Sequence, residues 1–435
     1  MARNDRIAPD LNTLPDTPPQ RTKFIDVAEL VVRGGRRLGF VAPERLEKDF
    51  LMEEARQATG LSDFGDRWFE RPFEVLLQSV HEEAALNPAG SFAAMKQFHH
   101  VLRDRLYAQM WFDRHPEILA RPLRNPVVIV GPMRSGTTRL HRLLASDQRF
   151  AHLRSFETIS PVPRPGYEDV MAGKAEDFRP KLAARILKVG RLANPRTLSI
   201  HPTGPYEPEE ELGLLVASFW SMKHDAQWNV PAYADWCLGE SAVPAYRHMA
   251  NLLRLIGWSQ GESSLRPFIL KTPQHMLDLD ALLEVFPDAR VIFSHRDPEA
   301  IVGSAASLAW NQTIIYSDEA DANRVGRQWL EKTGRQVERM RASRKRLPPG
   351  RSIDVRYDDM DRDWQATMAR VYEFLELDMA PAVAGMEAFI ERSRALKRTP
   401  HRYSLAQFGL TQDAVYERLG DYVEAFDIPT ARRIA

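Results

Sequence analysis

Residues 127–147 place a buried strand, a glycine-rich turn and the start of a helix in immediate succession. Residues 127–130 read Val-Val-Ile-Val, a short β-branched run that is typical of a strand covered on both faces. After the turn, Leu140, Leu143 and Leu144 recur at the spacing of one helix face. Glycines let the backbone approach an anion closely, and the N–H groups of a helix start point at that anion. The segment therefore predicts a phosphate-binding turn.

The turn has the spacing of a P-loop with one substitution. Gly131, Gly136 and Thr138 match the two glycines and the hydroxyl residue of the pattern G-x-x-x-x-G-K-[ST]. Thr137 stands where the pattern has the lysine that reaches the terminal phosphates of a nucleoside triphosphate. This substitution lowers the expectation of ATP or GTP hydrolysis and favours a different phosphate-bearing donor.

Strands and helices alternate along the chain after this turn. We expect further short strands at residues 268–270, 290–294 and 352–355, with helices between them. This alternation predicts an α/β fold, in which a P-loop-type parallel sheet is covered by helices on both faces. Because ligands bind at the carboxyl ends of parallel strands, we expect the glycine-rich turn, Lys271 and Arg296 to meet at one edge of the sheet.

Three regions are expected along the chain. Residues 1–22 carry four prolines among polar residues and predict a flexible lead. Residues 23–120 show helical spacing, for example at Phe98 and Leu102, and predict an N-terminal helical region without recognisable chemistry. Residues 121–435 are then expected to form the α/β domain that carries the site.

Composition and charge narrow the class of protein. The chain has 59 Lys plus Arg and 59 Asp plus Glu, and this zero net charge argues against nucleic acid as the main partner. The single cysteine, Cys237, cannot form a disulfide within the chain, which fits a reducing compartment. The sequence shows neither a signal peptide nor an apolar run as long as a transmembrane segment, so a cytoplasmic location is expected. Association with a membrane surface and formation of a homo-oligomer are left open.

Three segments in this order resemble the sulfotransferases that use 3′-phosphoadenosine 5′-phosphosulfate (PAPS). Residues 132–138, Pro-Met-Arg-Ser-Gly-Thr-Thr, are similar to the loop that binds the 5′-phosphosulfate in that family. Residues 290–298 together with Ser304 resemble its 3′-phosphate site, with the arginine and the serine eight residues apart. Residues 270–273, Leu-Lys-Thr-Pro, are similar to the Lys-x-Pro segment of the tyrosylprotein branch. The resemblance covers about residues 125–360 and is nearest to bacterial members.

A donor with a 3′-phosphate and a 5′-phosphosulfate needs two separate anion-binding sites. The resemblance implies the donor-binding residues Arg134, Ser135, Gly136, Thr137, Thr138, Arg139, Arg296, Ser304, Tyr357 and Arg398. The loop residues would hold the 5′ end, and Arg296 with Ser304 would hold the 3′-phosphate. Tyr357 resembles a tyrosine near the adenine, and Arg139 stands where cytosolic members stack a tryptophan on that base. Arg398 lies in a basic tail that would close over the 3′-phosphate.

In-line transfer of a sulfuryl group needs a cation at the leaving oxygen and a base at the acceptor hydroxyl. Arg134 and Lys271 are the candidate cations, and Lys271 is assigned to the leaving group because an arginine does not give up a proton. Arg134 would clamp the sulfonate and phosphate. Resemblance to the tyrosylprotein branch implies Glu157 as the base, with His275 as the second candidate. An ATP enzyme would need a Mg²⁺ carboxylate, whereas the strand before Arg296 ends basic, so no metal is expected.

These features predict a sulfotransferase that moves a sulfuryl group from PAPS to a hydroxyl of a small molecule, lipid or glycan. The alternatives are a P-loop kinase or NTPase with a degenerate loop, and a non-catalytic member of the family. The acceptor is not readable from the sequence. The acidic run at residues 207–211 is either the start of a helix or a wall of the acceptor pocket. The aromatic residues between positions 219 and 236 are either core or acceptor contacts.

Overall fold

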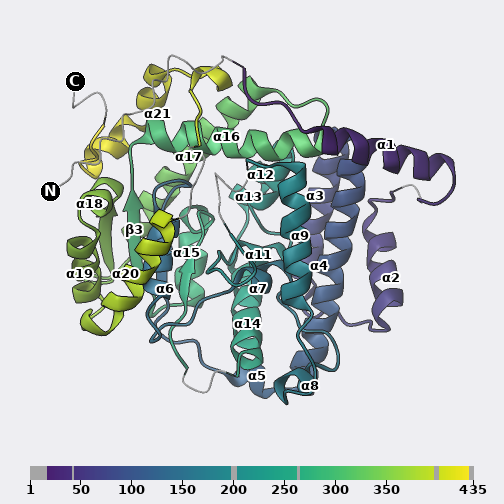
Figure 1. Ribbon diagram of the computed structural model, residues 1–435, viewed down its shortest axis with the longest axis horizontal. Helices are drawn as coiled ribbons and strands as arrows, with labels where there is room; N and C mark the ends of the chain where they lie inside the picture. Colours follow the sequence, from purple (N-terminus) through teal and green to yellow (C-terminus); the bar gives the residue numbers. More distant parts are fainter. Residues whose placement is uncertain (1–16, 42–43, 197–202, 262–264, 396–400, 431–435) are drawn as a thin grey trace.

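Four parallel strands form one sheet, which lies in Figure 1 on the side of the molecule away from the purple N-terminal helices. The computed structural model describes residues 17–41, 44–196, 203–261, 265–395 and 401–430. The strands are β1 (Val127–Val130), β2 (Ile269–Lys271), β3 (Arg290–His295) and β4 (Ser352–Arg356), in the order β2-β1-β3-β4. Val128 is in register with Leu270 on one side and with Val291 on the other. β1 lies between β2 and β3, so the strand order runs to one side from β1 to β2 and to the other side from β3 to β4. The turn after β1 therefore lies at the point where the strand order reverses, which is the usual position of a ligand.

Helices cover both faces of this sheet, so the predicted α/β class is confirmed. Val127 and Ile129 point into one apolar core, and Val128 and Val130 point into the other, because successive residues of a strand face opposite sides. The first core is completed by α6 (Thr137–Ala145), α18 (Tyr357–Arg362), α19 (Trp364–Phe374) and α20 (Ala380–Ala395). The second is completed by α14 (Val243–Ser259), α15 (His275–Val285), α16 (Pro298–Tyr316), α17 (Ala322–Arg344) and α21 (Gln412–Ala425).

The elements before β1 are helical and include a third apolar core beside the sheet. They are α1 (Lys23–Arg37), α2 (Lys48–Thr59), the short 3-10 turn η2 (Arg67–Phe69), α3 (Glu70–Glu83), α4 (Pro88–Arg114) and α5 (Glu117–Ala120). Asn87 starts the long α4 by accepting a hydrogen bond from the N–H of Gly90 at 2.7 Å. Phe219, Trp228 and Tyr233 are buried in this core, so these aromatic residues are structural.

Short helices connect the sheet to the N-terminal helices. They are α7 (Ser155–Ile159), α8 (Tyr167–Met171), α9 (Arg179–Ala193), α11 (Leu212–Val216), α12 (Lys223–Gln227) and α13 (Pro231–Gly239). Near the C-terminus, the 3-10 turn η3 (Ala406–Phe408) precedes α21. Helix α7 contacts both α9 and α11. None of the helices in the described ranges combines the length and the apolar character that crossing a bilayer requires.

Candidate active site

The glycine-rich turn between β1 and α6 is fixed by its neighbours. A Cβ on Gly131 would lie 2.7 Å from the carbonyl oxygen of Ser294. Gly136 has a φ of +90°, and a Cβ there would lie 2.7 Å from the ring of Tyr357. Ser294 Oγ also donates a hydrogen bond of 2.8 Å to the carbonyl oxygen of Ser135, which ties the turn to β3. Both glycines of the sequence pattern are therefore required by the close packing of the turn.

The turn forms a cradle that fits a phosphate or a sulfonate. The first N–H groups of α6 have no acceptor within the helix, and Thr137 and Thr138 line the cavity beside them. The hydroxyl of Ser135 instead donates to the carbonyl oxygen of Pro132 at 2.8 Å, so it serves the turn. Arg134 adopts a left-handed backbone with φ of +71°, a conformation that costs free energy and is concentrated at binding sites.

Arg134 and Arg296 lie side by side with Ser304 and Tyr357. Nη1 of Arg296 donates to the carbonyl oxygen of Arg134 at 2.8 Å, and its guanidinium carbon lies 3.9 Å from the centre of the Tyr357 ring. Nε of Arg134 donates to Ser304 Oγ at 3.0 Å. Burial lowers the pKa of Arg134, and the charge of Arg296 adds to this effect. Two partly desolvated guanidinium groups this close together favour a bound anion.

A C-terminal segment packs against this cluster. Tyr403 Oη donates to the carbonyl oxygen of Ala300 at 2.9 Å, and His401 Nε2 lies 2.9 Å from Ser307 Oγ. Burial lowers the pKa of His401 to about 4, with a further contribution from the charge of Arg134. The predicted tail residue Arg398 lies outside the described residues. The side chains that lie beside the cluster, those of His401 and Tyr403, come from the segment that follows Arg398 in the chain.

Lys271 lies next to the turn with its ammonium group between a hydroxyl and a carboxylate. It ends β2 and is almost completely buried. Its Nζ is 3.4 Å from Thr138 Oγ1 and forms an ion pair with Glu210. Its backbone N–H donates to Glu211 Oε2 at 2.9 Å. The edge of the sheet thus brings Lys271 to the glycine-rich turn, as the parallel arrangement predicts.

His275 is buried and both of its ring nitrogens are engaged. Nε2 lies 2.5 Å from Glu211 Oε1, and Nδ1 lies 2.8 Å from the hydroxyl of Tyr246. The side chain does not line the cavity at the turn. His275 thus contacts Glu211, which in turn accepts a hydrogen bond from the backbone N–H of Lys271.

Glu157 is also buried and does not line that cavity. Its carboxylate accepts a hydrogen bond of 2.8 Å from the backbone N–H of Arg154 and forms an ion pair with the same residue. Gln260 Nε2 donates to both carboxylate oxygens, at 2.9 and 3.1 Å. Glu157 thus caps the start of α7, and this geometry does not favour the predicted role as a base.

One cavity of about 1550 Å³ joins the glycine-rich turn to the N-terminal helices. Its polar end contains the turn, Arg139, Arg296, Tyr357, Glu209 and Glu210. Its apolar end is walled by side chains of α1, α4, α9 and α16. Arg139 forms an ion pair of 3.1 Å with Asp361 at the rim of this polar end, next to Tyr357. A volume above the usual range of about 300–1000 Å³ for one ligand leaves room for two reactants.

The acidic run at residues 207–211 contributes directly to the site. Glu209 and Glu210 line the cavity, Glu210 pairs with the side chain of Lys271, and Glu211 binds the backbone N–H of Lys271 and the ring of His275. The sequence left this run open between a helix start and a pocket wall. The cluster of carboxylates before a short apolar helix was the sequence signal for a site at this run. It did not identify the partner, because Lys271 lies 60 residues away from Glu211.

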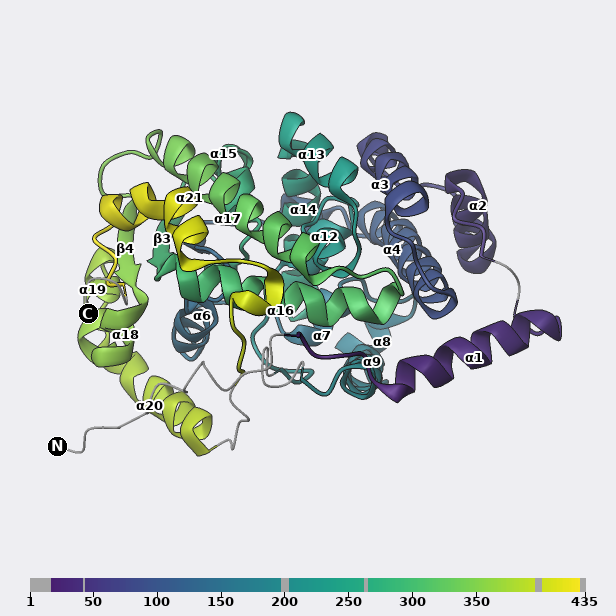
Figure 2. The same ribbon diagram turned by 90° about the horizontal axis from the view of Figure 1, so that it is seen from above.

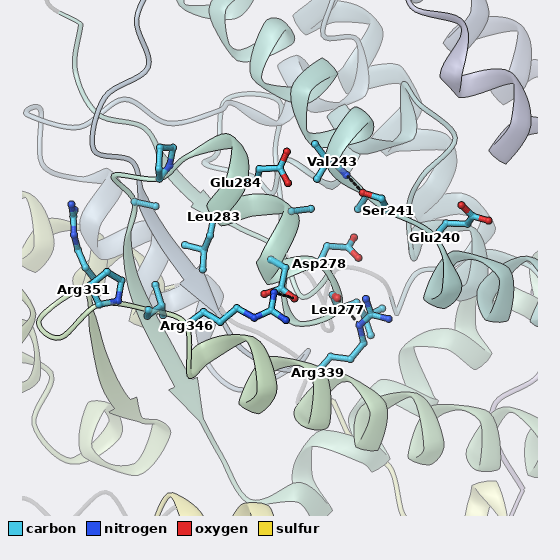
Figure 3. Close-up of a pocket in the computed structure, with 17 residues that line it drawn as sticks. Glu240, Ser241, Val243, Leu277, Asp278, Leu283, Glu284, Arg339, Arg346 and Arg351 are labelled. Carbon is cyan, nitrogen blue, oxygen red and sulfur yellow. Dashed lines mark hydrogen bonds and ion pairs between the residues drawn. The ribbon is translucent and has the colours of Figure 1, made fainter.

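A second, smaller cavity of about 520 Å³ lies elsewhere, between the start of α14, α15 and the end of α17 (Figure 3). Figure 3 shows Asp278, Glu284, Arg339 and Arg346 around it. Asp278 accepts hydrogen bonds from Trp220 and Gln274, at 2.8 and 2.7 Å, and thus belongs to the packing of α15. This cavity contains none of the predicted site residues.

Comparison with known proteins gives a consistent picture. The model of the sulfotransferase family matches residues 126–381. A curated relative, the omega-hydroxy-beta-dihydromenaquinone-9 sulfotransferase Stf3 of Mycobacterium bovis (strain ATCC BAA-935 / AF2122/97), is 24% identical over 314 residues. The match covers 69% of this chain and 74% of the relative. The protein of the same name from Mycobacterium tuberculosis (strain CDC 1551 / Oshkosh) matches equally well.

Two solved structures share the fold over nearly their whole length. Sulfotransferase STF1 from Mycobacterium tuberculosis H37Rv superposes with a TM-score of 0.74 at 30% identity, covering 86% of this chain and 98% of that chain. Sulfotransferase STF9 from Mycobacterium avium superposes with a TM-score of 0.77 at 25% identity, covering 89% and 98%. The similarity therefore includes most of the N-terminal helical region as well as the sheet.

Proposed function

This chain belongs to the sulfotransferase family and transfers sulfuryl groups, and from that premise we propose its donor, its acceptor class and its catalytic residues. The donor is PAPS. The acceptor is a hydroxyl on a small molecule with a long apolar part. The observation that carries this proposal is the pairing of Lys271 with Glu210 beside Thr138, because it sets a cation and a carboxylate next to a phosphate cradle.

The donor proposal rests on two groups of anion-binding residues around the glycine-rich turn. The N–H groups at the start of α6, with Thr137 and Thr138, would hold the 5′-phosphosulfate. Arg296 and Ser304 would hold the 3′-phosphate, with Arg134 between the two ends. Tyr357 and Arg139 lie on the same side of the turn and would border the adenine. When bound, PAPS supplies an activated sulfuryl group with a phosphate leaving group.

The cations near the turn stabilise the charge that transfer generates. As the bond between sulfur and the acceptor oxygen forms, the bond between sulfur and the 5′-phosphate oxygen breaks, and the electron pair leaves with the phosphate. Lys271 stabilises the developing charge on that oxygen, and Arg134 stabilises the sulfonate and the phosphate. Such a contact at a developing charge is worth about 10²–10³ in rate.

We assign the role of base to Glu210. It is partly exposed to the cavity and pairs with Lys271, whereas Glu157 and His275 are buried with their polar atoms engaged elsewhere. A carboxylate at this position can take the proton of an acceptor hydroxyl that enters from the apolar end. Its ion pair with Lys271 brings the proposed base and the proposed leaving-group cation to the same part of the site.

The acceptor class follows from the opposite end of the cavity. Side chains of α1, α4, α9 and α16 make this wall mainly apolar, which suits a hydrocarbon chain better than a glycan. The curated relatives are named for an omega-hydroxy derivative of a menaquinone, which is a lipid-like alcohol. Cys237, the single cysteine of the chain, supports the cytoplasm as the place of reaction.

Nucleotide binding tests the donor. Adenosine 3′,5′-bisphosphate should raise the melting temperature of the purified protein well above the effect of ATP with Mg²⁺, since ATP has no 3′-phosphate for Arg296. The variant Arg296→Ala should lose most of that preference. Equal stabilisation by both nucleotides would instead favour the P-loop kinase or NTPase alternative.

Three variants, each of which replaces one glutamate with glutamine, test the identity of the base. Glu210→Gln should lower kcat by about 10²–10⁴, the usual contribution of general base catalysis. Glu209→Gln, on the neighbouring residue in the same cavity, should lose far less. Glu157→Gln should mainly lower the melting temperature. A variant Glu157→Gln that folds normally and loses turnover more than Glu210→Gln would return the role of base to Glu157.

A further inference from the structure

The apolar end of the large cavity opens at the surface between α1 and α9. Val27 and Val31 of α1 and Ile186 and Val189 of α9 line the cavity and are also exposed. The two helices are joined where the Oγ1 of Thr22 donates to the carbonyl oxygen of Ala193 at 2.9 Å. Figure 2 shows α1 and α9 next to each other at one edge of the molecule.

Large apolar side chains gather around this opening. We use the name α1–α9 surface for Val27, Leu30, Val31, Ile186, Val189 and Leu192, which are between 44% and 70% exposed. Exposed apolar side chains are ordinary when they are scattered singly, but a cluster at the mouth of an apolar cavity indicates a surface that meets an apolar partner.

The charges beside this surface are strongly biased. Helix α9 contains five basic residues and no acidic residue, although the whole chain has no net charge. Arg185, Lys188 and Arg191 are exposed and form no ion pair within the described part of the chain. An amphipathic helix with a basic polar face and exposed aliphatic residues is typical of helices that lie in the interface of an anionic membrane.

We propose that the α1–α9 surface docks on an anionic membrane and receives the acceptor directly from the bilayer. The inference rests on the proposed function, because it names the source of the lipid-like acceptor. An apolar chain that enters between α1 and α9 would reach the glycine-rich turn without crossing water, since both ends belong to one cavity. A second copy of the chain fits this surface less well, because a two-fold contact would set one basic α9 against another.

Vesicle co-sedimentation with the full chain tests the surface. The protein should bind vesicles of phosphatidylcholine mixed with phosphatidylglycerol and should bind vesicles of phosphatidylcholine alone much more weakly. Added salt should weaken binding, because it screens charges at an exposed interface. Failure to bind the mixed vesicles at low salt would overturn the proposal.

Two double variants separate the apolar and electrostatic contributions. Leu30→Gln with Leu192→Gln, and Lys188→Gln with Arg191→Gln, should each reduce partitioning into mixed vesicles by about tenfold or more. These four side chains are exposed and do not line the cavity, so the fold should be kept. Leu119→Gln, on the exposed face of α5, is the matched control and should bind like the wild type.

The same proteins distinguish the surface from the chemistry. Stabilisation by adenosine 3′,5′-bisphosphate should be equal in the wild type and in both double variants. If the wild type binds vesicles but is not stabilised by adenosine 3′,5′-bisphosphate, the proposed donor is rejected and the proposed surface is kept. Unchanged vesicle binding by the variant with Leu30→Gln and Leu192→Gln would reject the surface. A wild-type dimer that this variant dissociates, without vesicle binding, would replace the membrane with a second copy.

Discussion

The two ends of the cavity are built in different ways. The proposed donor end consists of short segments at one edge of a parallel sheet: the turn after β1, Lys271 at the end of β2 and Arg296 after β3. Its polar groups are tied to one another by hydrogen bonds and ion pairs. The proposed acceptor end consists of faces of α1, α4, α9 and α16, which are far apart in the sequence and meet through apolar side chains.

This difference teaches where each half tolerates change. The donor end holds a left-handed Arg134 and glycines without room for a methyl group, so a small alteration displaces several binding groups together. The acceptor end is a wall of separate side chains, where one change in size alters binding by about 1–3 kcal/mol. Donor recognition should therefore fail sharply and acceptor preference should shift gradually.

Among the variants that test this contrast, a change at Lys271 should have the largest effect. The variant Lys271→Met keeps the length of the side chain and removes the charge at the leaving oxygen, so kcat should fall by about 10²–10³. Affinity for adenosine 3′,5′-bisphosphate should change less. The matched control is Lys223→Met, on a lysine that lines the large cavity from α12, and it should keep most of the turnover. Equal losses in the two variants would contradict the assignment.

The glycine at the start of α6 gives the next effect. In Gly136→Ala, the new Cβ meets Tyr357 and the backbone stays at positive φ, which together cost about 1–3 kcal/mol. Affinity for adenosine 3′,5′-bisphosphate, measured by calorimetry, should fall by at least about tenfold. Gly420→Ala in α21, where a Cβ meets open space, should leave binding intact and stabilise the helix by up to about 1 kcal/mol.

A change at the acceptor end should sharpen the contrast. Ala93 on α4 lines the apolar end of the cavity, and Ala93→Phe would fill part of the space for a hydrocarbon chain. The KM for a long-chain alcohol should rise by about tenfold, while that for a short-chain alcohol stays the same. Stabilisation by adenosine 3′,5′-bisphosphate should not change, and a loss of this stabilisation would show that the two ends are not independent.

The smallest effect concerns pH. His224 of α12 is buried, and among the described residues neither ring nitrogen has a hydrogen-bond partner. Burial lowers its pKa to about 3, with a contribution from Lys223, so below the unfolded pKa of about 6.5 the unfolded chain binds more protons. The free energy of unfolding should fall by about 1 kcal/mol from this group between pH 6.5 and 5.5.

Denaturant titrations of the wild type and of His224→Leu across this range measure the contribution. The difference between the two proteins should be constant from pH 7 to 8, where the histidine is neutral in both states. As the pH falls further, the free energy of unfolding of the wild type should fall relative to that of the variant. Parallel curves would mean that His224 finds a partner when it is protonated.

Much of the fold could be predicted because it depends on patterns among residues that are close together in the sequence. The strand at residues 127–130 was predicted with its observed bounds, since a run of four β-branched residues is typical of a strand buried on both faces. The second strand begins at Ile269 instead of residue 268, a small shift at an element end. The division of the chain at residues 22 and 120 stays a prediction.

Roles that depend on partners in space were harder to read. Glu157 follows α6 as a glutamate does in the tyrosylprotein branch, yet its carboxylate is used by Arg154 and Gln260 to start α7. Glu210 lies in an acidic run that looks like any helix start, and only its ion pair with Lys271 distinguishes it. Sequence spacing contained no information on either pairing.

The sequence by itself determined the α/β class and the anion-binding turn, because glycine spacing and apolar runs act over a few residues. It also determined that Lys271 and Arg296 share an edge with the turn, since parallel strands end together. The tertiary structure decided which carboxylate faces the cavity and which helices wall its apolar end. These contacts join residues far apart in the chain. Their geometry is set by the burial of apolar surface, and an apolar residue in the sequence does not reveal which residue it packs against.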